Sequence, residues 1–103
     1  MFSSSVGILF QLLVWHLIAD VLLQPQALAN AKRKPGVAGV AVLVLHGFIH
    51  GLGTGLILES LWAVLLETFA HTLVDFGKCR GYYGLAPDQC AHLTCLGCWW
   101  FVI

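Results

Sequence analysis

The chain has 103 residues, of which 59% are hydrophobic and only 10% are charged. A soluble domain of this length cannot bury so much apolar surface, because small domains keep a large fraction of their surface exposed. The formal net charge is zero, which gives no electrostatic case for a nucleic-acid partner. We therefore expect a single transmembrane domain over residues 1–103, with the lipid bilayer as its main partner.

Four apolar segments predict an all-α fold, a polytopic bundle of about four short transmembrane helices. We expect these helices at residues 6–23, 37–58, 60–77 and 88–103, where a spanning helix needs roughly 17–25 residues. The first helix should stop before Pro25, because proline disfavours helix at the preceding residue. No basic segment precedes it, so we interpret it as a mature helix rather than a signal peptide.

The segments between these helices are polar or rich in glycine. Residues 24–36 and 78–87 are expected to be loops, and the turn between the second and third helices falls either at 59–60 or within 51–55. Glycines recur at every fourth position in the second helix, at Gly47, Gly51 and Gly55. This spacing lets the backbone of a neighbouring helix come close.

The basic residues predict an orientation. All five of them fall in the two expected loops: Lys32, Arg33, Lys34, Lys78 and Arg80. Four antiparallel helices put both loops on one side, which the positive-inside rule assigns to the cytoplasm. We expect a multi-pass protein of the inner membrane with both termini outside the cytoplasm. Trp62, Trp99 and Trp100 would then form an aromatic belt near the outer boundary.

Ionisable or amide side chains recur at four-residue spacing on every expected helix, which puts each set on one helix face. The sets are His16, Asp20 and Gln24; His46 and His50; Glu67, His71 and Asp75; and Asp88 with His92. Such residues are unfavourable inside a membrane and usually mark function. Their placement therefore predicts one shared intramembrane site.

Residues at equal height in an antiparallel pair have numbers with a constant sum, and this rule arranges the site in three tiers. The tier nearest the cytoplasm holds Gln24, Asp75 and Asp88; the middle tier holds Asp20, His46, His71 and His92; the deepest holds His16, His50 and Glu67. The middle tier should converge on a common point.

Imidazoles and carboxylates in this pattern are typical ligands of a divalent metal such as zinc or iron. We interpret as metal ligands His16, Asp20, His46, His50, His71, Asp88 and His92. A metal activates water for hydrolysis, with Glu67 or Asp75 as the general base. The favoured hypothesis is a metal-dependent hydrolase that acts on a lipid-like or amphipathic substrate.

Two other functions stay open. The polar residues could hold together the helices of a non-enzymatic accessory subunit, within a larger membrane complex or a homo-oligomer. They could also line a proton or metal-ion conduit. The four cysteines, Cys79, Cys90, Cys95 and Cys98, are interpreted as small apolar side chains.

Four motifs in order resemble a family of small bacterial and phage membrane proteins, known as domain of unknown function 3307. The motifs are H-x3-D-x3-Q-P at His16–Pro25, H-x3-H at His46–His50, H-x3-D-x2-K at His71–Lys78 and D-Q-x2-H at Asp88–His92. The resemblance covers almost the whole chain. It implies the membrane fold and the importance of these residues, and it implies no particular activity.

Overall fold

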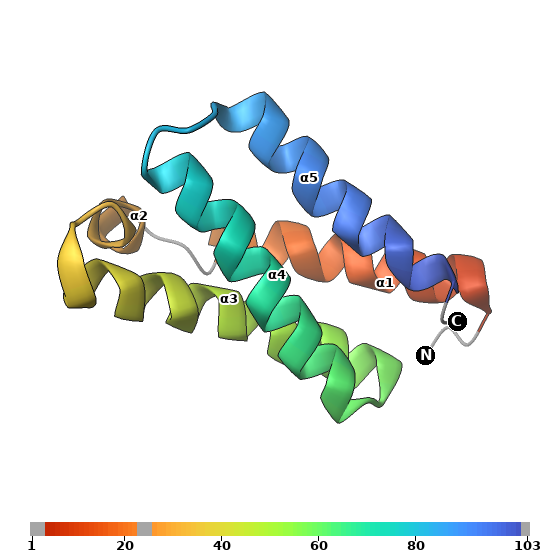
Figure 1. Ribbon diagram of the computed structural model, residues 1–103. Coiled ribbons are helices and arrows are strands. Elements are labelled where there is room, and N and C mark those ends of the chain that lie inside the picture. The colour runs from red at the N-terminus through yellow and green to blue at the C-terminus, as the bar shows by residue number, and fades with distance from the viewer. Residues whose placement is uncertain (1–3, 23–25, 102–103) are drawn as a thin grey trace.

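The computed structural model describes residues 4–22 and 26–101. Within these ranges the chain is all-α, as predicted, with no strand. The helices are α1 (Ser5–Leu17), a π-helical turn η1 (Ile18–Leu22), α2 (Gln26–Lys32), α3 (Gly36–Leu58), α4 (Leu61–Cys79), α5 (Leu85–Cys98) and a 3-10 turn η2 (Trp99–Phe101) (Figure 1).

The expected helices 6–23, 37–58, 60–77 and 88–103 correspond to α1 with η1, α3, α4, and α5 with η2. Residues 23 and 102–103, and Gln24 of the expected tier nearest the cytoplasm, lie outside the described ranges. The loop expected at 24–36 is wrong in part, because α2 lies within it. Its sequence, QALANAK, is rich in alanine, the strongest helix former, which offsets its polar composition.

The turn between α3 and α4 falls at Glu59–Ser60, which decides between the two predicted positions. Glu59 ends α3 in the left-handed region (φ 53°). Ser60 then caps α4, since its hydroxyl accepts a hydrogen bond from the backbone N–H of Ala63 (3.3 Å). The glycines at 51–55 are therefore free to lie within a continuous helix.

The glycine stripe of α3 packs directly on α4. A Cβ atom at Gly47 or Gly51 would lie 2.1 Å from a threonine Oγ1 of α4, and one at Gly55 would lie 2.0 Å from the Val64 side chain. Only hydrogen fits at these positions, so the predicted close approach of two helix backbones is confirmed. The contact holds the histidines of α3 against α4.

The burial pattern is inverted relative to a soluble protein. Among the described residues, the buried hydrophobic side chains are just Leu12, Ala19, Leu43 and Ala63, and the buried polar or ionisable ones outnumber them. Large apolar side chains cover the outside; Val37, for example, is 87% exposed. Such a distribution suits an apolar surrounding better than water.

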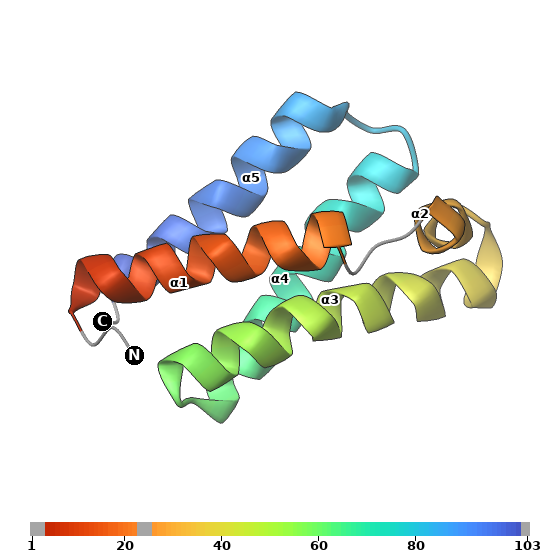
Figure 2. The same cartoon turned by 180° about the vertical axis from the view of Figure 1, so that it is seen from behind.

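Two described segments are long and apolar enough to cross a membrane: Ser5–Leu22, which joins α1 to η1, and Gly36–Leu58. α4 carries Glu67, Asp75 and Lys78, and α5 has 14 residues, so neither has this character. The molecule is elongated, with extents of 41 × 23 × 22 Å. α2 and the α4–α5 connection lie at one end, opposite the α3–α4 turn and the start of α1 (Figures 1 and 2).

Candidate metal centre

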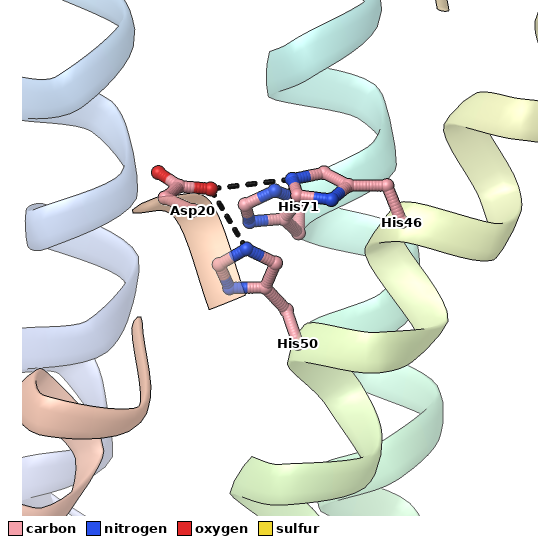
Figure 3. A group of neighbouring side chains, drawn as sticks. All are labelled: Asp20, His46, His50 and His71. Carbon is pink, nitrogen blue, oxygen red and sulfur yellow. Dashed lines mark hydrogen bonds and ion pairs between the residues drawn. The ribbon is translucent and has the colours of Figure 1, made fainter. Parts of the chain in front are cut away.

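Four side chains from three segments meet in the interior: Asp20 from η1, His46 and His50 from α3, and His71 from α4 (Figure 3). One oxygen or nitrogen from each lies within 4.8 Å of the others. Asp20 Oδ1 is 2.8 Å from His50 Nε2 and 3.2 Å from His46 Nε2. We call these four residues the first ligand group.

The π-helical turn places the carboxylate of this group. η1 holds Asp20 where α1 ends, and such turns are frequent at functional sites. One turn earlier, Trp15 fixes α1 on α3, because its indole Nε1 donates to the carbonyl oxygens of Ile49 and His50 (3.2 Å each). Gly53 makes room for the indole, since a Cβ there would lie 2.0 Å from the ring. Trp15 thus serves helix packing.

His71 is the distinctive member of the first ligand group. It is 2% exposed, and neither of its ring nitrogens has a hydrogen-bond partner in the part of the chain that the structure describes. Its ring stacks between those of His50 (3.7 Å between centroids) and His92 (4.1 Å). A buried polar group without a partner is unfavourable by about 1–3 kcal/mol. A cation bound to one nitrogen would remove part of that penalty.

A second ligand group lies beside the first and consists of Asp75, Asp88 and His92. Its ligand atoms also lie within 4.8 Å of one another. Asp88 Oδ1 is 3.2 Å from His92 Nε2. The ammonium group of Lys32 at the end of α2 lies 2.6 Å from Asp75 Oδ2, and both residues are buried.

Gln89 connects the two ligand groups. Its amide nitrogen lies 3.1 Å from Asp88 Oδ2 and 3.4 Å from Asp20 Oδ2. Its amide oxygen lies 3.4 Å from Nε2 of His16, which is itself 3.4 Å from Asp20 Oδ2. His16 therefore contacts the first ligand group from outside, and Gln89 ties α5 to Asp20.

Glu67 belongs to neither ligand group. It lies one turn before His71 on α4, and its Oε2 accepts a hydrogen bond from Trp99 Nε1 (3.1 Å) in η2. Glu67 is 8% exposed, so this bond supplies a needed partner to a buried carboxylate. Trp99, expected in the aromatic belt, is half-buried, and its indole N–H contacts this buried carboxylate.

The observed groups differ from the predicted tiers. The constant-sum rule places His92 with Asp20, His46 and His71, whereas the structure places His50 there and puts His92 with the carboxylates. The rule assumes parallel axes, but α3 and α4 cross at an angle (Figures 1 and 2). One helical turn rises only about 5.4 Å, so the imidazole of His50 can reach the level of His46, one turn away on the same helix.

Sequence reasoning missed Lys32 as a site residue. Its position in the most polar stretch of the chain marked it as a loop cation. Asp75 is expected near the same end of the bundle and is the sequence signal that could have indicated a partner for Lys32, because a buried lysine needs an anion.

A cavity of about 290 Å³ opens beside both ligand groups. The polar part of its wall contains Asp20, Lys32, Asp75, Lys78, Asp88, Gln89 and His92; the apolar part contains Leu17, Val21 and Leu85. The wall of this cavity therefore has candidate metal ligands on one part and apolar side chains on another.

The donor set of the first ligand group fits a divalent transition metal. Three imidazoles and one carboxylate are ligands that zinc and iron accept. These four residues come from three segments, and a metal ion would join η1, α3 and α4. The unpartnered nitrogens of His71, considered within the described ranges, fit the same ion.

Fold and site together define an all-α protein with an apolar exterior and a buried cluster of histidines and aspartates. A family model described as "Protein of unknown function (DUF3307)" matches residues 8–102, and the chain belongs to this family. No curated protein matches the chain. No solved structure matches it either.

Proposed function

We propose that the protein is a metal-dependent hydrolase of the inner membrane that acts on an amphipathic substrate. The observation that carries the proposal is His71, which is buried within reach of three other ligands while both its ring nitrogens lack a partner among the described residues. Polar residues that only join helices would be expected to bond each other, as Lys32 and Asp75 do.

The membrane placement is supported by the apolar exterior and by two segments of spanning length and composition. In this proposal α4 and α5 also cross, with their ionisable residues turned inward. The basic residues near α2 and the α4–α5 connection would face the cytoplasm, and both termini would lie outside it.

In the proposed reaction the first ligand group, Asp20, His46, His50 and His71, holds zinc or iron. When bound, the ion supplies a Lewis acid and an activated water. The cavity accepts the polar group of the substrate, while Leu17, Val21 and Leu85 contact its apolar part.

Of the two candidate bases, Asp75 is the better placed. It lines the cavity, whereas Glu67 does not contribute to the cavity wall and is held by Trp99. A general base has to reach the proton that it removes, directly or through one water. We therefore assign the general base to Asp75.

The test compares wild type with His71→Ala in detergent. Each protein is loaded with zinc or iron and desalted, its metal content is measured by elemental analysis, and its hydrolysis of para-nitrophenyl acetate and phosphate in mixed micelles is followed. We expect about one metal per wild-type chain, and loss of metal and hydrolysis in His71→Ala.

Phe69→Ala is the matched control, because Phe69 lies on the same helix and is 68% exposed. It should keep both metal and hydrolysis. Folded wild-type protein that binds neither metal would refute the proposal and favour an accessory subunit held together by its polar residues.

A further inference from the structure

Lys32 is a buried cation in an unexpected place. It is 3% exposed although it ends a short polar helix, and its Nζ lies 2.6 Å from Asp75 Oδ2, 43 residues away in the sequence. A lysine is almost never fully buried unless it is paired. The ion pair therefore sets the position of the end of α2.

The surroundings of this ammonium group are those of a metal site. Asp75, Asp88 and His92 bring ligand atoms within 4.8 Å of one another. Asp88 is 1% exposed, and its Oδ1 accepts no hydrogen bond from the described residues, although His92 Nε2 lies 3.2 Å away. Two carboxylates and an imidazole are a set that suits a divalent cation.

We propose that the ammonium group of Lys32 fills the second cation position of the site, so that the second ligand group is a metal site closed by a residue of the chain itself. The ammonium neutralises part of the charge of Asp75 and Asp88. It also repels a divalent ion over a short distance through a poorly polarisable interior. The protein consequently holds one metal, in the first ligand group, rather than two.

This inference deepens the proposed function, on which it rests for the ion in the first ligand group. It predicts that removing the charge of Lys32 opens the second group to a metal. If Lys32 only holds α2 against α4, removing its charge should loosen α2 and leave the number of bound metals unchanged.

The experiment measures zinc per chain after loading and passage over a chelating resin, in detergent. Lys32→Met keeps most of the aliphatic stem and removes the charge, so it should bind one more zinc per chain than wild type. Adding Asp88→Asn should return the count to the wild-type value. Lys78→Met is the matched control, because Lys78 lines the same cavity, and it should leave the count unchanged.

If Lys32→Met does not fold, Lys32→Gln is measured in its place, because the glutamine amide can still donate a hydrogen bond to Asp75. It should also gain one zinc per chain. An unchanged count in a folded variant would overturn the inference, as would failure of both variants to fold in the presence of zinc. The wild-type count tests the proposed function, whereas the difference between variant and wild type tests this inference, so the two can fail separately.

Discussion

The indole Nε1 of Trp15 lies 3.2 Å from the backbone carbonyl oxygen of His50. Trp15 precedes the π-helical turn that carries Asp20, and His50 is the histidine closest to that carboxylate. The contact between α1 and α3 and the geometry of the first ligand group therefore depend on the same side chain.

Replacing Trp15 by phenylalanine should weaken both packing and metal binding. The substitution keeps much of the ring but removes the N–H donor, so we expect a loss of about 1 kcal/mol in the free energy of unfolding. Zinc affinity should fall as well, because Asp20 loses its fixed position relative to His50. Thermal unfolding in detergent and zinc titration measure the two effects.

The control for this variant is Trp62→Phe. Trp62 lies on the outside of α4 and is 73% exposed, so its replacement should change neither quantity. Equal effects of the two substitutions would contradict the role assigned to Trp15.

Gly51→Ala should separate α3 from α4. The added Cβ would lie 2.1 Å from Thr68 Oγ1 and 2.6 Å from the backbone oxygen of Val64, which cannot move as a side chain does. Overpacking of this kind destabilises by about 1–3 kcal/mol. Zinc binding should weaken too, since His50 and His71 face each other across this contact.

Gly97→Ala serves as the control, because a Cβ at Gly97 meets nothing within 4 Å. It should leave stability unchanged or raise it by about 0.5–1 kcal/mol, since alanine favours helix. The thermal unfolding of both variants in detergent checks the comparison. A Gly51→Ala protein as stable as wild type would show that the glycine stripe is not needed for packing.

The helices could be predicted from the sequence because apolar runs and their breaks are local signals. The close contact at Gly47, Gly51 and Gly55 follows from an equally local pattern, whereas the sequence left the turn open between 59–60 and 51–55 until the structure placed it at Glu59. α2 was missed because its polar composition resembles that of a loop, whereas its helix propensity and the pairing of Lys32 decide its structure.

The candidate site could be predicted only in outline. Four-residue spacing shows which side chains share a face, so the convergence of Asp20, His46 and His71 was foreseeable. It does not give helix crossing angles, which bring His50 into the first ligand group. The partners of Asp75 and Glu67, Lys32 and Trp99, lie far from them in the sequence, so the spacing along one helix does not identify them. For Asp75 the sequence gives only the expectation that basic residues lie at the same end of the bundle.

The orientation in the membrane can be tested at Asn30, which is exposed on α2. A cysteine is placed there in a background without native cysteines and treated with an impermeant maleimide in intact cells. We expect no labelling, because the end of the bundle that carries the basic residues of α2 and the α4–α5 connection should face the cytoplasm. A cysteine at Glu59, which is exposed at the opposite turn, should be labelled; the reverse pattern would mean that the orientation is inverted.

The last prediction concerns the hydrogen bond between Trp99 and Glu67 (3.1 Å). Trp99→Phe leaves the buried carboxylate without its donor, so we expect a loss of about 1–3 kcal/mol in the free energy of unfolding. Glu67→Gln should lose less, because its amide oxygen still accepts from Trp99. Both variants should keep one metal, since neither residue belongs to a ligand group.

Hydrolysis then separates the two candidate bases. Glu67→Gln should hydrolyse para-nitrophenyl esters at nearly the wild-type rate, because Glu67 does not line the cavity that holds Asp75. The measurement compares rate, metal content and thermal unfolding for wild type and both variants in the same detergent. If Glu67→Gln keeps its metal and stability but loses hydrolysis, then Glu67 is the general base. The substrate would in that case have to approach from the end of the bundle where η2 meets α4.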